Sequence, residues 1–409
     1  MADSSLKTLN DLRSGRTPWQ ANGAAPDRDY PAHITCDVVI VGAGITGAFL
    51  AERLTRRGLR VVVLDRHMPE RASTAASTAL LLWELDTPLR DLEDRLGFET
   101  ASSIYRRSVQ GVQAIAALVS RYAIACDFIA RDSLFLAGDK LDPADLREEE
   151  RLRRMAGLDS RYLAAGAVES CGFRAEGALR SGGSAEADPV ALARGLMTLA
   201  QQRGAALLSP MTAVAYDATV SGVAVATDRG TQIVSAALVL ATGYDMPEFV
   251  TAPSHRLFST WALASNPLPP QSLWPDRCLV WEASDPYLYL RSMADGRLVV
   301  GGADEEIADA AAREALMPAK AAEILRRLAA RFRQFDRTDI AYAWSGLFGV
   351  TDDGLPLIGR VPGMAHCYAA FGYGGNGITF SAIAADIIDR LLRGEHGADM
   401  DSFALDRQG

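Results

Sequence analysis

Segment 37–47 constrains the fold of this chain more than any other part of the sequence. Its continuous run of apolar, mainly β-branched residues indicates a buried parallel strand, which runs directly into a G-x-G-x-x-G motif. A helix is expected over 45–57, and Gly58 ends it. A second buried strand follows at 61–64, with Asp65 directly after it. This order of strand, glycine turn, helix, strand and acid predicts a βαβ unit that binds a dinucleotide.

Each residue of the motif has a physical reason. Gly42 makes the tight turn, Gly44 lets the backbone approach a pyrophosphate, and Gly47 lets the helix pack closely on the strand. The free N–H groups at the start of the helix face the phosphates, and Asp65 accepts a hydrogen bond from a ribose hydroxyl.

The composition is that of a globular protein with room for two domains: 409 residues, 49% hydrophobic and 23% charged. A net charge of -9 argues against a nucleic-acid partner. The chain has five scattered cysteines and no C-x-x-C motif. This pattern favours free thiols over disulfides or a zinc site. The dispersed histidines give no metal-binding cluster either, so no metal is expected.

The first 34 residues are polar and carry both charge signs, without the apolar core of a signal peptide. We interpret 1–34 as an N-terminal arm that leads into the first strand. No apolar run reaches the length of a membrane span, and a cytoplasmic location is expected.

Further elements follow from caps and periodicity. Helices are expected over 89–96, 100–122, 143–157, 189–203 and 317–333, and a hairpin over 287–300 turns at Asp295 and Gly296. Near the end, a strand at 366–371 runs into the glycine-rich turn 372–377, and a last helix covers 378–393.

The second glycine cluster does not predict a second nucleotide site, because no further strand with an acidic tip follows the last helix. We interpret it as a helix N-terminus that faces the cofactor bound by the first motif, where it stabilises negative charge. A plain glycine-rich turn without a ligand is the alternative.

Four signatures lie, in this order, at 39–44, 73–81, 238–243 and 354–359, the last leading to 371–378. This set resembles the FAD-dependent oxidoreductases of the D-amino-acid oxidase, glycine oxidase and sarcosine oxidase superfamily. Together the signatures span nearly the whole chain. The set of signatures is specific for FAD binding, but it says little about which substrate is bound.

The resemblance implies an α/β fold with a Rossmann-type FAD domain and a substrate domain around a larger mixed sheet. The FAD domain would be assembled from 35–90, 185–250 and 340–409, and the substrate domain from 91–184 and 251–339. The motif and the resemblance together give these candidates for FAD binding: Gly42, Gly44, Ile45, Thr46, Gly47, Asp65, Arg66, His67, Thr74, Ala75, Ser77, Thr78, Leu80, Val214, Ala241, Thr242, Gly243, Gly372, Gly374, Gly375, Asn376, Gly377 and Ile378.

The match departs from the family at the substrate side. Relatives that oxidise amino acids hold the substrate carboxylate with an arginine, and Phe348 stands at that position here. Arg291, in the expected hairpin, is the best substitute, with a structural ion pair as its alternative role.

Two other family features are missing from the sequence. Val299 stands where sarcosine-type oxidases hold the lysine that promotes reaction with oxygen, and Gly346 where they tether the flavin through cysteine. Cys367 lies on the strand expected at 366–371 and is interpreted as a core residue. The resemblance therefore implies non-covalent FAD, and a dehydrogenase is slightly favoured over an oxidase.

The candidates for the reaction itself are Tyr373, Arg291, His255 and Tyr289, with Tyr287, Trp261 and Trp344 as further cavity candidates. Tyr373 takes the place where relatives hold a polar or aromatic residue near the reacting carbon. His255 is the candidate base, although a histidine beside an arginine is more often structural.

We expect oxidation of a C–N bond in a small amine or amino-acid-like substrate, by hydride transfer to flavin N5. Such a reaction needs orientation and desolvation more than a strong base. An FAD dehydrogenase for a hydroxy acid or polyol, with His255 as base, is the first alternative. A flavoprotein subunit for electron transfer or assembly is the second. The electron acceptor, oxygen, a quinone or a carrier, stays open.

Overall fold

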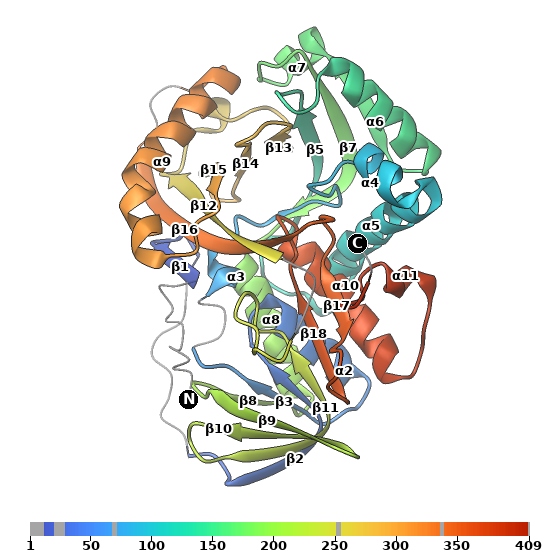
Figure 1. Cartoon of the computed structure of the whole chain (residues 1–409). Coiled ribbons are helices and arrows are strands. Elements are labelled where there is room, and N and C mark those ends of the chain that lie inside the picture. The colour runs from blue at the N-terminus through green and yellow to red at the C-terminus, as the bar shows by residue number, and fades with distance from the viewer. Residues whose placement is uncertain (1–11, 20–28, 68–71, 251–254, 336–338, 408–409) are drawn as a thin grey trace.

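The computed structural model describes residues 12–19, 29–67, 72–250, 255–335 and 339–407. Within these ranges the chain forms two β-sheets, one above the other, with helices packed around both (Figure 1). The elements of both sheets come from segments far apart in the sequence. The arrangement is the α/β class that the sequence predicted, with a second, mixed sheet.

The smaller sheet has the strand order β17-β18-β11-β2-β3-β8, and β10 and β9 extend it from β11. Its strands are β2 (His33–Val41), β3 (Val61–Leu64), β8 (Ala206–Leu208), β9 (Ala213–Thr219), β10 (Gly222–Thr227), β11 (Gln232–Leu240), β17 (Leu357–Arg360) and β18 (Cys367–Phe371). The run from β18 to β8 is parallel. Parallel strands covered on both faces need continuous apolar sequence, which is why β2 and β3 were recognisable.

Four helices pack together beside this sheet: α2 (Ile45–Arg56), α5 (Phe98–Tyr122), α8 (Pro189–Gln202) and α10 (Gly377–Leu392). Residues such as Ile40, Leu50, Leu196 and Ile387 share one core. The strand-turn-helix-strand unit and the last helix are confirmed, with ends within a residue or two of those expected.

The larger sheet has the order β1-β16-β12-β15-β14-β13-β5-β7-β4, and β6 pairs with β7. Its strands are β1 (Arg13–Gly15), β4 (Leu80–Leu81), β5 (Ile129–Leu136), β6 (Ser160–Ala164), β7 (Gly177–Glu186), β12 (His255–Ser265), β13 (Leu279–Glu282), β14 (Leu288–Ser292), β15 (Leu298–Glu305) and β16 (Ile340–Thr351). The expected hairpin is confirmed as the antiparallel pair of β14 and β15.

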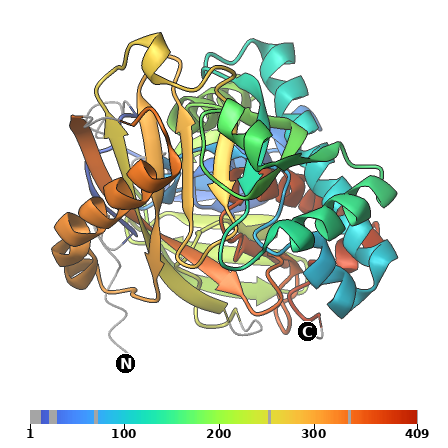
Figure 2. The ribbon, with the colours of Figure 1, turned by 90° about the horizontal axis from the view of Figure 1, so that it is seen from above.

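The remaining helices are α3 (Ser73–Ala76), α4 (Leu89–Leu96), α6 (Pro143–Met155), α7 (Ala165–Ser170), η1 (Pro270–Ser272), α9 (Ala310–Arg331) and α11 (Ala398–Asp401). Seen from above, α9 lies at one side of the molecule and α4 to α6 at the other (Figure 2). None of the helices in the described ranges has the length and apolar composition that a membrane span requires.

The chain crosses between the two sheets several times. β16 begins at the domain boundary expected at residue 340, yet it pairs with β12 in the larger sheet, and β17, β18 and α10 join the smaller one. β4, within the expected FAD segment 35–90, pairs with β7 of the larger sheet.

Part of the expected N-terminal arm is integrated into the fold. β1 pairs with β16, and the Ser14 hydroxyl lies 2.7 Å from that of Ser345. Trp19 is buried, packs against Ala75 and Val190, and donates from Nε1 to the Ser77 carbonyl at 3.0 Å. The prediction of a polar lead-in segment was therefore wrong for residues 12–19, and residues 1–11 and 20–28 lie outside the described ranges.

Candidate functional site

One cavity of about 1070 Å³ lies between the two sheets. The carboxyl ends of β2, β3 and β11 and the N-termini of α2 and α10 border it on one side. Residues of β12, β13, β14 and β16 border it on the other. Ligands of open α/β sheets bind outside the carboxyl ends of the strands, so this is the expected place for a nucleotide.

The glycine turn after β2 has the tight geometry that the motif predicts. Gly42 has φ +110°, and a Cβ there would overlap the Ala241 carbonyl oxygen. A Cβ at Gly47 would overlap the Gly42 carbonyl oxygen. Gly44 lines the cavity, and a Cβ added there would have Thr74 Oγ1 as its closest neighbour, at 3.1 Å. The bare Gly44 backbone therefore leaves room for a phosphate to approach.

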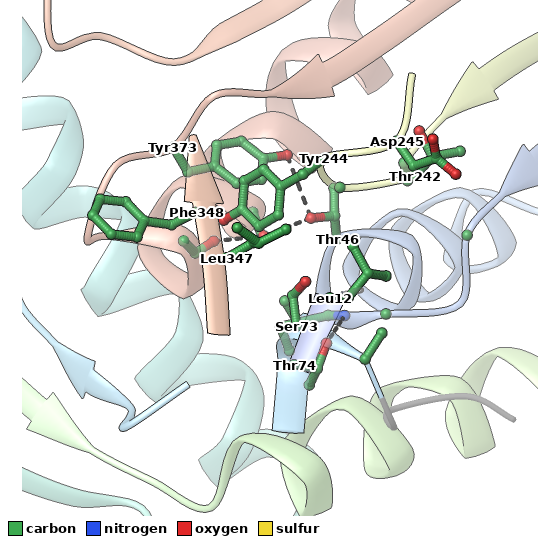
Figure 3. A pocket seen from close by; sticks show the side chains of 18 of the residues that line it. Leu12, Thr46, Ser73, Thr74, Thr242, Tyr244, Asp245, Leu347, Phe348 and Tyr373 are labelled. Atoms are coloured by element: carbon green, nitrogen blue, oxygen red, sulfur yellow. Dashed lines mark hydrogen bonds between the residues drawn. The ribbon is translucent and has the colours of Figure 1, made fainter. Parts of the chain in front are cut away.

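The first turn of α2 is presented to the cavity by Gly44, Ile45 and Thr46. Its N-cap, Gly44, has no capping side chain, and the Ile45 N–H donates to Thr74 Oγ1 at 3.0 Å (Figure 3). A helix N-terminus whose N-cap residue has no side chain, and which opens into a cavity, is a suitable site for a pyrophosphate.

Asp65, after β3, lies at the cavity wall. Its Oδ2 accepts from the Ala43 N–H at 2.6 Å and its Oδ1 from the His67 N–H at 2.8 Å. Burial raises the pKa of Asp65, and these two backbone N–H groups oppose the shift. Each carboxylate oxygen keeps capacity for a second donor, as binding of a ribose hydroxyl requires.

The cavity continues past Asp65 to a part we call the adenosine end. Arg66 and Asp245 form an ion pair there, and Val214 lies beside them with over half of its surface exposed. The rings of Tyr216 and Phe249 meet edge to face at 5.4 Å. This wall combines apolar surface with charge, as an adenosine requires.

Segment 72–80 forms another wall, and three side chains from elsewhere in the fold hold its carbonyl groups. Trp344 Nε1 donates to Ala76 O at 2.8 Å. Trp19 Nε1 donates to Ser77 O, and Arg291 Nε donates to Thr78 O at 2.7 Å. These bonds fix the backbone at the position where the resemblance places pyrophosphate and flavin.

The turn before α10 brings the second glycine cluster to the cavity. Gly375 N–H donates to Asp86 Oδ2 at 2.6 Å, and Asn376 is buried with its amide on the Glu84 carbonyl. The Tyr373 hydroxyl lies 3.3 Å from Thr46 Oγ1 (Figure 3). The two glycine motifs therefore face one cavity, as expected for a helix N-terminus that faces the cofactor.

The structure brings nearly all predicted FAD residues to the cavity wall; Gly47, Ala75 and Gly372 are the exceptions. Gly47 lies beneath the Gly42 carbonyl, and Ala75 packs against Trp19. Gly372 has φ +71° and lies against Thr351. These three positions shape the backbone behind the wall.

Of the four candidates for the reaction, Tyr373 and Tyr289 line the cavity, as does Tyr287. The Tyr289 hydroxyl lies 3.3 Å from Thr260 Oγ1. Burial raises the pKa of both Tyr289 and Tyr373, so these phenols stay neutral at physiological pH.

Arg291 lies behind the cavity wall. Its side chain is buried, donates to the carbonyls of Thr78 and Ala187, lies 3.6 Å from Glu186 and stacks over Trp19. The expectation that Arg291 grips a substrate carboxylate is corrected by this position, because all of its polar atoms point into the protein. Its alternative role, a structural ion pair, is the one observed.

His255 and two of the tryptophans are also placed outside the cavity. His255 lies at the start of β12, with its ring centroid 5.4 Å from that of Phe371. It is not among the described residues that line the cavity. Trp261 and Trp344 are fully buried, and their Nε1 groups donate to Arg313 O and Ala76 O. The proposed base and these two cavity candidates are therefore not at the site.

Sequence reasoning missed several wall residues: Leu12, Asp86, Tyr244, Asp245, Thr260, Trp281 and Leu347. Tyr244 and Asp245 directly follow the predicted 241–243 signature and could have been included. Leu12 and Asp86 carry no local signal. Tyr244, Leu347 and Phe348 gather beside Tyr373 (Figure 3).

The fold and the cavity are those of a dinucleotide-binding protein, with the cavity between a sheet that has a parallel centre and a second, mixed sheet. Residues 37–391 match the family model of the FAD dependent oxidoreductases, and the chain belongs to this family. It is an FAD-dependent oxidoreductase, and the glycine turn, Asp65 and the α10 N-terminus fit that cofactor.

The chain is similar to gamma-glutamylputrescine oxidoreductase of Escherichia coli (strain K12), with 28% identity over 94% of this chain and 89% of the relative. It is 23% identical to glycine oxidase of Geobacillus kaustophilus (strain HTA426), over 91% of this chain and 97% of the relative. The crystal structure of the glycine oxidase from Geobacillus kaustophilus superposes with a TM-score of 0.76 at 20% identity, covering 92% of this chain and all of that one.

Proposed function

We propose that this protein oxidises a C–N bond in a small amine or amino-acid-like molecule. Bound FAD would accept a hydride at N5 from the carbon next to the substrate nitrogen, and the imine product would hydrolyse. The observation that carries the proposal is the wall opposite the glycine turn, where Tyr287, Tyr289, Trp281 and Phe348 give an aromatic lining. The named activities of the similar proteins, on gamma-glutamylputrescine and on glycine, support the same reaction class.

The aromatic lining has two tasks in this reaction. It excludes water, and it orients the C–H bond toward the cofactor. A neutral amine gives up a hydride without a strong base, and the described lining residues at this end include no histidine, lysine or arginine.

A hydroxy-acid or polyol dehydrogenase would need a base for the hydroxyl proton. His255 was the candidate, and its place on Phe371 outside the cavity weakens this alternative. An electron-transfer or assembly subunit stays the other alternative.

We infer that FAD is held without a covalent bond. Gly346 lines the cavity where a tethering cysteine would stand, and Cys367 is buried at the start of β18, in the core of the smaller sheet. FAD in the supernatant after acid or heat denaturation supports this, and flavin recovered on a peptide overturns it.

For the electron acceptor we propose a quinone or carrier in preference to oxygen. Val299 is fully buried, and no lysine occurs among the described residues that line the cavity. Stopped-flow mixing of the reduced enzyme with air should show slow reoxidation, whereas a rate similar to that of efficient oxidases would overturn the inference.

An anaerobic substrate screen tests the reaction class. Amines, N-methyl amino acids and hydroxy acids are added singly to the yellow protein, and the flavin absorbance is followed. Bleaching by amine-type compounds, with a carbonyl product and released ammonia or amine, supports the proposal. Bleaching by hydroxy acids alone, with a ketone product, would replace it with the dehydrogenase alternative, and no bleaching by any class would favour the electron-transfer alternative.

A further inference from the structure

The cavity is asymmetric in charge. The charged lining residues Asp65, Arg66 and Asp245 belong to the adenosine end, and Glu248 lies in the same segment after β11 as Asp245. We call the opposite part, bounded by segment 80–86 and the larger sheet, the substrate end. Among the described residues that line the substrate end, Asp86 is the only acid, and none is basic.

Asp86 is held against the glycine turn before α10. Its Oδ2 accepts from Gly375 N–H at 2.6 Å, and a Cβ at Gly374 or Gly375 would lie only 2.7 or 2.9 Å from its oxygens. Among the described residues no donor reaches its Oδ1. Asp86 is exposed and lines the cavity, so its second oxygen is open to a ligand.

A second acid lies beside the same wall. Asp304 on β15 has its Oδ1 buried and without a partner among the described residues. Burial raises the pKa of Asp304 to about 7, repulsion from Asp86 adds to the shift, and the hydroxyls of Thr260 and Tyr287 oppose it. Lys320 also opposes the shift, but its ammonium lies 2.6 Å from Glu305.

Aromatic rings complete this end. The ring centroids of Tyr287 and Tyr289 lie 5.5 Å apart. The negative charges of Asp86 and Asp304 contribute to raising the pKa of both tyrosines, which burial raises most. Phe348, at the position of the family's carboxylate-binding arginine, packs on Phe258. Asp86 in the lining, with tyrosine faces beside it and Asp304 buried behind, forms a surface suited to an ammonium group.

We propose that the substrate is a cationic amine without a carboxylate, such as a diamine or an N-substituted diamine, whose non-reacting ammonium binds Asp86. Asp304 adds negative charge behind Tyr287. This inference rests on the proposed function and narrows its substrate class. A substrate carboxylate would instead meet an acid at this end, with no basic side chain among the described lining residues.

The test compares straight-chain diamines with monoamines of the same length, and with N-methyl amino acids, in anaerobic titrations of the flavin spectrum. Perturbation of the oxidised spectrum gives Kd, and bleaching gives the reduction rate. The diamine should bind roughly 30-fold or more tightly than the matched monoamine, as expected for a desolvated charge pair. In Asp86→Asn this preference should fall to about threefold or less.

Asp86→Asn keeps an acceptor for the Gly375 N–H, so FAD content should stay unchanged. Asp94→Asn, at an exposed position on α4, makes the same charge change away from the cavity and should keep the full preference. If Asp86→Asn does not retain FAD, the same comparison is made in Asp304→Asn, where a smaller preference supports the proposal and an unchanged one overturns it.

The outcomes separate this proposal from the proposed function. Equal binding of monoamines and diamines, or better binding of amino acids, overturns cation recognition while amine oxidation stands. An unchanged diamine preference in Asp86→Asn shows that Asp86 only fixes the glycine turn. If diamines perturb the oxidised spectrum in an Asp86-dependent way and no amine bleaches the flavin, the cation site stands and amine oxidation fails.

Discussion

The hydroxyl of Tyr373 lies 3.3 Å from that of Thr46, although 327 residues separate them. Thr46 also lies 2.8 Å from Ser381 Oγ on α10. The first turn of α2 and the turn before α10 are therefore joined directly, and each carries a glycine motif that faces the cavity. We propose that Tyr373 acts through this contact as a positioning residue.

Tyr373→Phe should change flavin reduction by less than about tenfold, because Thr46 keeps its contact with Ser381. Since burial raises the pKa of Tyr373, the phenol stays protonated and the pH profile of reduction should keep its shape. Stopped-flow reduction between pH 6 and 9 checks this. Loss of one limb of the profile would show instead that Tyr373 exchanges a proton with the substrate.

Gly44→Val should give folded, colourless protein, because the new side chain would occupy the space that the pyrophosphate needs. The measurement is the flavin-to-protein absorbance ratio after purification, with circular dichroism to verify the fold. Gly166→Ala is the matched control, since its Cβ would meet nothing within 4 Å, and it should stay yellow. A yellow Gly44→Val protein would place the cofactor elsewhere.

Arg291→Met should lower the free energy of unfolding by about 1–3 kcal/mol, because buried Glu186 loses one of its two partners and keeps only Arg131. FAD binding should weaken as well, since the Thr78 carbonyl loses its donor. Urea unfolding measures the first effect and flavin titration the second. Unchanged stability together with selective loss of acidic substrates would restore a substrate role for Arg291.

Asp304→Asn should stabilise the substrate-free protein more at pH 8 than at pH 5. The pKa of Asp304 is raised to about 7 in the fold, mainly by burial, so the unfolded chain releases this proton at lower pH. Stability is therefore lost as pH rises toward 7, and the asparagine removes that loss. Urea unfolding at the two pH values measures the gain, and Asp94→Asn should show no such trend. An equal gain at both pH values would contradict a buried, titrating Asp304.

The parts that sequence reasoning predicted well are local. β2, the glycine turn, α2, β3 and Asp65 are contiguous, and each is specified by short-range rules for strands, turns and helices. The hairpin of β14 and β15 is also local. Most residues predicted to bind FAD therefore line the cavity, whereas Leu12, Tyr244 and Asp245 were missed.

The parts that it predicted poorly depend on distant contacts. The expected hairpin supplied Tyr287, Tyr289 and Arg291 as cavity candidates, but Arg291 is covered by Trp19 and Thr78 from far upstream. Asp86 has its partner, Gly375, 289 residues away. No spacing rule encodes such pairs, so the substrate end appears only in the fold.

The central claim is FAD-dependent oxidation of an amine, and one anaerobic single-turnover experiment tests it most directly. Enzyme with its bound FAD is mixed with an excess of a diamine, the loss of flavin absorbance is followed, and the products are identified. We predict complete bleaching with one equivalent of carbonyl compound and one of released ammonia or amine per flavin. A flavin that no amine or amino acid bleaches, while a hydroxy acid or an external electron donor reduces it, would contradict the claim.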